Sequence, residues 1–130
     1  MTARSIVVTG LAVILLTANA CSLAKGRANS SKNVAPSSVA AGKQLFESHC
    51  ASCHGMNAAG GMKIGIATSA DLRQRHLEPL YHNDTSLLER AILDGKDEEG
   101  KSLNPAMPRW RGQLSKEQVD SIIAYLKTLK

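Results

Sequence analysis

A five-residue stretch constrains this 130-residue chain more than any other feature, and it reads Cys50-Ala51-Ser52-Cys53-His54. In a helical turn, positions i, i+3 and i+4 share one face, so both thiols and the imidazole would point toward one flat ligand. The spacing Cys-x-x-Cys-His is typical of c-type haem attachment, in which two cysteines form thioether bonds to the haem vinyl groups. His54 would then reach the iron from the same side as the proximal ligand.

Two other chemistries use a Cys-x-x-Cys pair. A structural zinc site needs four Cys or His ligands, usually as two pairs, but the only other cysteine is Cys21, which lies in an apparent export signal. A redox dithiol of the thioredoxin type belongs to a βαβ unit, and no strand pattern flanks this pair. The flanking sequence therefore favours haem over zinc, a redox dithiol or a chance match.

Residues 1–20 have the features of a signal peptide, because Arg4 precedes an apolar run and Ala18-Asn19-Ala20 forms a cleavage site. The apolar run is shorter than the ~20 residues of a membrane span. Cys21 follows at once, and the stretch resembles a bacterial lipoprotein signal, in which the cysteine carries lipid. Three interpretations stay open: lipidation of Cys21, cleavage to a soluble protein with a free Cys21, and an uncleaved helical anchor.

We interpret residues 21–37 as a flexible linker, lipid-anchored if Cys21 is modified, because Ser, Ala, Asn and Lys cannot bury enough apolar surface to order it. Residues 38–130 form the one folded domain. The net charge of +5 comes mostly from the linker. No basic face is interleaved with aromatic residues, so we expect no nucleic-acid partner.

Hydrophobic periodicity in residues 38–130 predicts an all-α fold with three main helices, a short additional one and no convincing strand. The expected helices begin near Ser37 or Ser38 and run through Cys50, span Ser69 to His76 (the short one), span Thr85 to Asp94 with a Ser86–Glu89 capping box, and begin at Ser115 with a Ser115–Gln118 capping box. Aromatic residues make up only 3% of the chain. A haem would supply apolar bulk that such a small domain lacks.

A haem iron needs a sixth partner or an open site, and the chain offers three methionines after its apparent signal. Met56 follows His54 too closely to reach the opposite haem face, and Met62 is only marginally able to do so. Met107 lies far along the chain between two prolines, which stiffen its loop. Met107 is therefore the candidate ligand, with an ordinary core side chain as the alternative.

The domain resembles the class I c-type cytochromes, in particular the bacterial single-haem members, over about residues 38–130. Three blocks carry the resemblance: Ala41–Gly55, Ala106–Trp110 and Ile123–Lys127. The resemblance implies the class I cytochrome c fold around one covalently bound haem c. Within it, Cys50 and Cys53 would hold the haem by thioether bonds, and His54 and Met107 would be the axial iron ligands.

The resemblance also implies that the first and last helices cross near Gly42, Phe46 and Tyr125, and that Trp110 packs against the haem or donates to a propionate. One feature departs from the family. Many members have a proline after the haem motif, whose carbonyl accepts the proton of the proximal imidazole, but here that region reads Ile64-Gly65-Ile66. Another backbone carbonyl would have to serve.

We therefore predict a monomeric electron carrier that is exported to the bacterial periplasm and exchanges electrons with redox partner proteins. Its iron would cycle between the ferrous and ferric states. No general acid–base pair, nucleophile or substrate pocket is suggested, so we expect no enzymatic activity. The alternatives are an electron-accepting subunit of a periplasmic oxidoreductase and a haem-based gas sensor.

Overall fold

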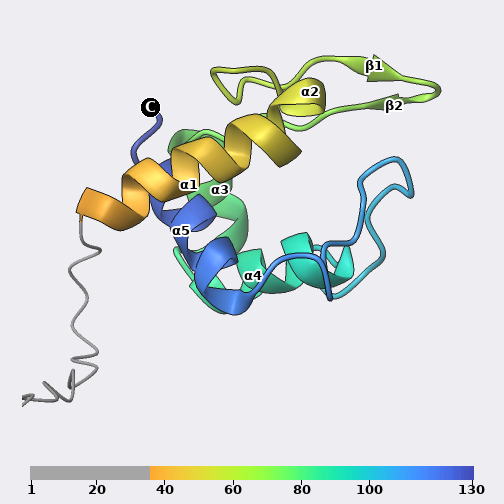
Figure 1. Ribbon diagram of the computed structural model, residues 1–130. Helices are drawn as coiled ribbons and strands as arrows, with labels where there is room; N and C mark the ends of the chain where they lie inside the picture. Colours follow the sequence, from red (N-terminus) through yellow and green to blue (C-terminus); the bar gives the residue numbers. More distant parts are fainter. Residues whose placement is uncertain (1–35) are drawn as a thin grey trace, which may run out of the picture. The chain divides into compact units, whose positions relative to one another are not determined.

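A computed structural model of the protein describes residues 36–130, so the expected signal peptide (1–20), Cys21 and most of the expected linker (21–37) lie outside the described residues. The described part is mostly helical, as predicted, with five helices and one small hairpin (Figure 1). Their bounds are α1 Pro36–His49, α2 Ala51–His54, β1 Lys63–Ile64, β2 Ala67–Thr68, α3 Gln74–Tyr81, α4 Thr85–Asp94 and α5 Lys116–Leu126.

The most extensive helix packing joins α1 to α5, where the sequence predicts a crossing at Gly42. A Cβ atom on Gly42 would lie 1.8 Å from the Ser121 carbonyl oxygen and 3.0 Å from the Ile122 nitrogen. One turn further along α1, the fully buried Phe46 contacts Tyr125 of α5, with ring centroids 5.5 Å apart. The missing side chain at Gly42 thus lets the two backbones touch, which confirms the predicted close contact.

The last helix matches its prediction at its start. Ser115 accepts from the Gln118 N–H, and the Gln118 side chain accepts in return from the Ser115 N–H, which completes the capping box. The helix ends at Leu126, so Leu129 packs on the core from beyond the helix. The buried face of α5 is formed by Val119, Ile122, Ile123, Ala124, Tyr125 and Leu126.

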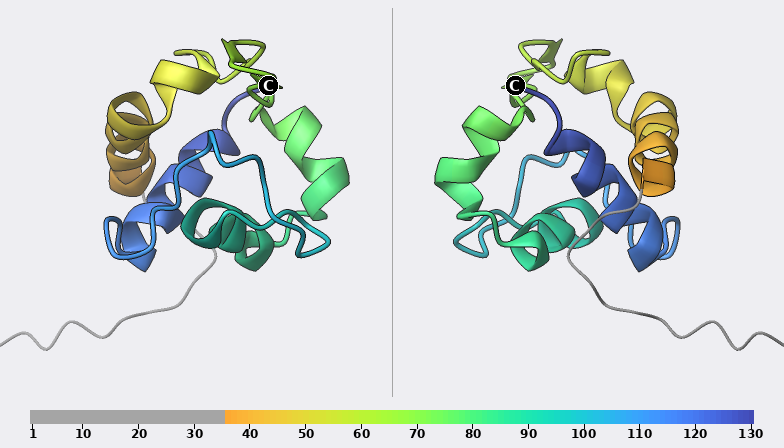
Figure 2. Two further views of the ribbon diagram at one scale, coloured as in Figure 1. Left: turned by 90° about the vertical axis from the view of Figure 1, so that its right-hand side faces the viewer. Right: turned by 90° about the vertical axis from the view of Figure 1, so that its left-hand side faces the viewer.

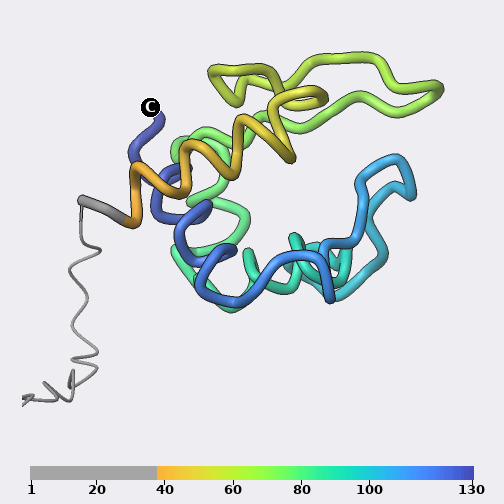
Figure 3. Tube along the Cα trace, viewed as in Figure 1, coloured from red at the N-terminus to blue at the C-terminus, as the bar shows by residue number. Residues whose placement is uncertain are grey.

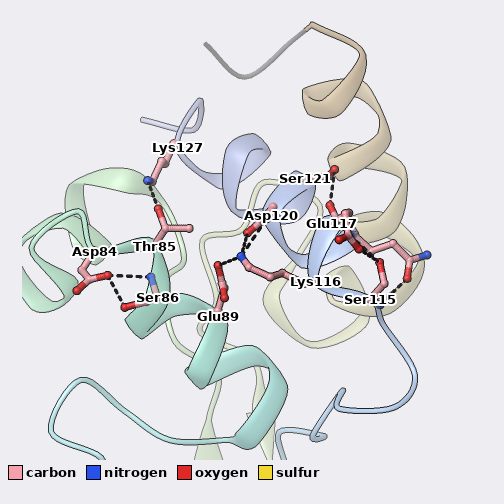
Figure 4. A network of polar contacts seen from close by, with 11 residues as sticks. Asp84, Thr85, Ser86, Glu89, Ser115, Lys116, Glu117, Asp120, Ser121 and Lys127 are labelled. Carbon is pink, nitrogen blue, oxygen red and sulfur yellow. Dashed lines mark hydrogen bonds and ion pairs between the residues drawn. The ribbon is translucent and has the colours of Figure 1, made fainter. Parts of the chain in front are cut away.

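The bounds predicted for α4 are correct, but its predicted capping box is wrong. Asp84 caps this helix, because its carboxylate accepts from the Ser86 N–H at 2.8 Å. Glu89 instead pairs with Lys116 of α5 and so ties α4 to α5, and the Lys116 ammonium also donates to Asp120 within α5 (Figure 4). Gly95 ends the helix in the left-handed region that favours glycine, at φ 62°.

The structure corrects two other expectations. The short helix spans Gln74–Tyr81 rather than Ser69 to His76, because the Ser69 carbonyl accepts from the Gly61 N–H in the hairpin segment instead of from a helical turn after it. The hairpin itself was not predicted, and its two strands pair Lys63 with Thr68 across a turn at Gly65. Strands of two residues are too short for an alternating pattern to reveal them.

Three views agree on how these elements are arranged. The α2 turn and the hairpin lie at the top of Figures 1 and 2, and the loop of residues 95–114 passes below them. The tube in Figure 3 follows this loop from the end of α4 to the start of α5.

Within residues 36–130, none of the helices is both long and apolar enough to cross a membrane.

Candidate functional site

The Cys-x-x-Cys-His motif occupies the junction between α1 and α2. Cys50 has φ −118° and ψ −36°, which breaks the helix there, yet its N–H still donates to the Phe46 carbonyl at 2.8 Å. The Cys50 carbonyl then accepts from the N–H groups of Cys53 (3.1 Å) and His54 (3.0 Å). The motif is therefore one tight turn anchored on Phe46, the residue that α1 buries against α5.

The two thiols are half-buried and do not form a disulfide. Burial, and secondarily the charge of Cys53, raise the pKa of Cys50 to about 11. Burial thus favours the neutral thiol over the thiolate at Cys50. Residues 36–130 contain no group of three or more His, Cys, Asp or Glu side chains placed to hold a metal ion.

The His54 ring is oriented by the backbone of a distant residue. Only 9% of His54 is exposed, and its Nδ1 lies 2.8 Å from the Ala70 carbonyl oxygen. A carbonyl only accepts, so Nδ1 carries the proton, and the lone pair of Nε2 is left for a metal. This is the arrangement of a metal-binding histidine, and it fits an axial haem ligand.

The Ala70 carbonyl takes the role that the carbonyl of a proline has in many members of the family, namely to accept the proton of the proximal imidazole. Ile64, Gly65 and Ile66 form the hairpin and its turn, and Ile66 is fully exposed at the tip. The sequence carried no signal for Ala70, because every residue type offers a backbone carbonyl. Sequence reasoning therefore missed this contact to His54.

The glycine-rich loop after His54 lets the segment after β2, which contains Ala70, approach the motif. The Gly60 N–H donates to the His54 carbonyl at 2.8 Å, with Gly60 in the left-handed region at φ 64°. A Cβ atom at Gly60 would lie 2.3 Å from the Ala70 carbonyl oxygen. The missing side chain at Gly60 therefore makes room for the carbonyl that holds His54.

Met107 and Trp110 lie in the loop between α4 and α5, and both are half-buried. The loop is pinned to α4, because the Trp110 N–H donates to the Ile92 carbonyl at 3.2 Å. Next to Met107, the Asn104 side chain accepts from the Ala106 N–H at 2.9 Å. These bonds restrict the backbone around the candidate ligand on both sides.

One contact joins this loop to the haem motif. The Trp110 ring meets the His49 ring edge-on, with centroids 5.0 Å apart. His49 directly precedes Cys50, so the contact brings the loop of Met107 against the end of α1. The sequence prediction named Trp110 but not His49, although an aromatic residue beside Cys50 was a visible signal.

Comparisons with known proteins indicate the family to which the chain belongs. The family model described as "Cytochrome c" matches residues 39–130. Cytochrome c-554(547) of Halothiobacillus neapolitanus is 37% identical over 95 residues, which cover 71% of this chain and 97% of that protein. Cytochrome c6 of Tetradesmus obliquus is 32% identical over 88 residues, covering 68% of this chain and 86% of that protein.

A third relative is larger than this chain. The Cbb3-type cytochrome c oxidase subunit FixP of Bradyrhizobium sp. (strain ORS 278) is 29% identical over 91 residues, which cover 70% of this chain but only 27% of that subunit. The chain belongs to the cytochrome c family. It carries one covalently bound haem c, and it serves as an electron carrier.

Proposed function

We propose that the protein is an exported, single-haem electron carrier whose iron is bound by His54 and Met107. One observation carries the proximal half of this proposal: His54 is buried and donates through Nδ1 to the Ala70 carbonyl, which leaves Nε2 for the iron. Bound haem supplies an iron that gains or loses one electron. The rest of the mechanism is the positioning of that iron by the chain.

Cys50 and Cys53 are proposed as the thioether attachments. Their place on one tight turn with His54 supports this role, because covalent bonds there fix the ring relative to the imidazole. This turn is bound to Phe46 by the hydrogen bond from the Cys50 N–H, and Phe46 contacts Tyr125 of α5. We therefore infer that attachment, ligation and core packing depend on one another.

Met107 is proposed as the distal ligand. A thioether stabilises ferrous iron and raises the reduction potential relative to His-only ligation. The loop of Met107 is held by backbone bonds to α4 and by the contact between Trp110 and His49. A ligand restrained in this way moves little between the two oxidation states, which suits electron transfer. Trp110 would pack against the haem or donate its indole N–H to a propionate.

Export to the bacterial periplasm is part of the same proposal. The signal features of residues 1–20 support it, and so does the covalent haem, since the family attaches haem c outside the bacterial cytoplasm. Lipidation of Cys21 would tether the protein to a membrane, and cleavage without lipid would leave a soluble monomer. In either form it would exchange electrons with redox partner proteins and would not itself be an enzyme.

A second candidate function has one observation in its favour. The similarity to FixP covers about a quarter of that subunit, so this domain also occurs within an oxidase complex. The present chain would then be an electron-accepting subunit rather than a free carrier. Co-purification with a partner complex after mild detergent extraction distinguishes the two, because a free carrier elutes alone.

The ligand assignment is tested on the purified holoprotein by optical spectra and carbon monoxide binding. We expect low-spin, six-coordinate haem in both oxidation states and little binding of carbon monoxide. Met107→Ala should open the site, permit carbon monoxide binding and lower the potential. Met62→Ala is the matched control, because Met62 is exposed in the hairpin segment.

Two results would contradict the assignment. If Met62→Ala opens the site and Met107→Ala does not, Met62 is the ligand. If the wild type already binds carbon monoxide rapidly, the gas-sensor alternative replaces the carrier.

A further inference from the structure

The Ala70 carbonyl that holds His54 is itself confined on both sides. Before it, Ser69 is held in the hairpin, where its carbonyl accepts from the Gly61 N–H at 2.9 Å. After it, the Leu72 N–H donates to the Ala58 carbonyl at 2.8 Å. These two bonds restrict the chain on either side of Ala70 and Asp71, so the orientation of the peptide between them decides how well the Ala70 carbonyl meets the His54 ring.

The side chain that follows Ala70 forms the most complete ion pair near the motif. The Asp71 carboxylate accepts from the backbone N–H of Arg73 at 2.9 Å and from its guanidinium Nε at 2.9 Å, and it also pairs with the guanidinium Nη2. The exposed fractions of the Asp71 and Arg73 side chains are only 16% and 22%. His76 adds a third contact, with Nε2 3.0 Å from the carboxylate.

The electrostatics of Asp71 also favour this ion pair. The hydrogen bond from Arg73, together with its charge and that of His76, holds the pKa of Asp71 well below its usual range. The charged carboxylate is therefore favoured at neutral pH. Planar, bidentate pairs of this kind restrict both partners more than a lysine pair does.

The ion pair connects the Ala70 carbonyl to the rest of the fold. Arg73 is the residue that precedes α3, and its carbonyl accepts from the Leu77 N–H at 3.1 Å. The next residue, Gln74, donates its N–H to the Leu129 carbonyl at 2.9 Å. Asp71 therefore fastens the peptide after Ala70 to the start of α3 and to the C-terminal segment.

We propose that the Asp71–Arg73 pair is a positioning element, which sets the strength of the hydrogen bond between His54 and Ala70 and through it the reduction potential. A stronger bond from Nδ1 makes the imidazole a better donor and favours ferric iron. Releasing the carbonyl weakens the bond, so the potential rises. The inference rests on the proposed function, in which His54 is an axial ligand.

The alternative is a plain electrostatic effect of two charges near the iron, and the two explanations predict different signs. A field effect alone raises the potential in Asp71→Ala, lowers it in Arg73→Ala and leaves it unchanged in Arg73→Lys. Positioning raises it in all three, because lysine keeps the charge but lacks the planar fork. The expected rise is up to a tenfold change in the ferric-to-ferrous equilibrium constant, about 59 mV for a one-electron couple.

The experiment measures the potential of the holoprotein and, in the ferrous state, the exchange rate of the His54 Nδ1 proton by NMR. We expect faster exchange in Asp71→Ala, Arg73→Ala and Arg73→Lys. The matched control is Asp84→Ala, since Asp84 also accepts a backbone N–H two residues ahead, at the start of α4. Its exchange rate should equal that of the wild type.

A lowered potential in Arg73→Ala, or unchanged exchange rates in all three variants, would overturn the proposal. If one variant fails to fold, the others still decide, because Arg73→Lys changes only the shape of the cation. Failure of the proposed function is recognised separately. In that case the wild-type spectrum itself lacks the low-spin signature of His/Met ligation.

Discussion

The contact between α1 and α5 at Gly42 yields the sharpest prediction about stability. In Gly42→Ala, the new Cβ would lie 1.8 Å from the Ser121 carbonyl oxygen, whereas non-bonded heavy atoms prefer about 3.5–4.0 Å. The nearest atoms belong to the backbone of α5, so no side chain can rotate away. The two helices must separate by about 1.5 Å or more at their closest point.

The cost follows from two opposing effects. Overpacking a core costs about 1–3 kcal/mol, and a clash with the backbone of a helix belongs at the upper end. Replacing a helical glycine by alanine returns about 1 kcal/mol of helix propensity. The net loss is therefore about 2 kcal/mol or more, which lowers the melting temperature of a domain of this size by about 8–16 °C.

Guanidinium denaturation of the holoprotein, followed by far-ultraviolet circular dichroism, measures this loss. The control is Ala40→Gly, because Ala40 is exposed on the same helix. That change should cost up to about 1 kcal/mol from propensity alone. If Gly42→Ala is as stable as the wild type, or more stable, α1 and α5 are not in backbone contact and the reasoning is refuted.

Three other measurements test the site and the chain's N-terminal part. The haem should stay on the protein in a denaturing gel and resist acidified organic solvent, whereas extraction would show that Cys50 and Cys53 form no thioethers. The free energy of unfolding should fall as the pH drops below about 4, because the pKa of Asp71 is lower in the folded protein and the unfolded chain therefore takes up the proton first. In urea denaturation, Asp71→Asn should make the free energy of unfolding less dependent on pH in this range. An unchanged pH dependence in Asp71→Asn would contradict the prediction. Cells given labelled fatty acid should label the protein if Cys21 is lipidated, and Cys21→Ser should then release it from the membrane, while unlabelled, freely soluble wild type rules lipidation out.

The sequence was most informative where periodicity and side-chain chemistry coincide. The start of α5 followed from the Ser115–Gln118 box, and the crossing of α1 and α5 near Gly42 was implied by the resemblance to the class I c-type cytochromes. Both features depend on residue type, because only glycine allows the close approach and only certain side chains cap a helix. Such features can be read without a structure.

The start of α3 was misplaced for the opposite reason. Ser69 looks like a helix cap, but its backbone is already engaged with Met62 in the hairpin. Arg73 then takes the position before the helix, with its extended backbone at ψ 150°. Local propensity cannot foresee this, because the competing partner lies several residues away in the chain.

In the candidate site too, residues that act through their side chains were predicted and residues that act through their backbone were not. Cys50, Cys53, His54 and Met107 were named from their side chains, and these assignments stay predictions until ligation is measured. Neither Gly60 nor Ala70 was foreseen, because Gly60 contributes the absence of a side chain and Ala70 contributes a backbone oxygen. Sequence patterns therefore identify the candidate iron ligands more readily than the backbone groups that position those ligands.

The two halves of the site, His54 and Met107, are held by different parts of the fold. A change in one part of the fold should therefore affect the two candidate ligands differently. The His54 side depends on α1, on the segment of Ala70 that follows β2, and on the crossing at Gly42. The Met107 side depends on its loop, which the Trp110 backbone bonds to α4. A weakened crossing should therefore disturb the proximal turn directly, whereas it reaches the Met107 loop through the ring contact at His49 and through the start of α5, which follows the loop in the chain.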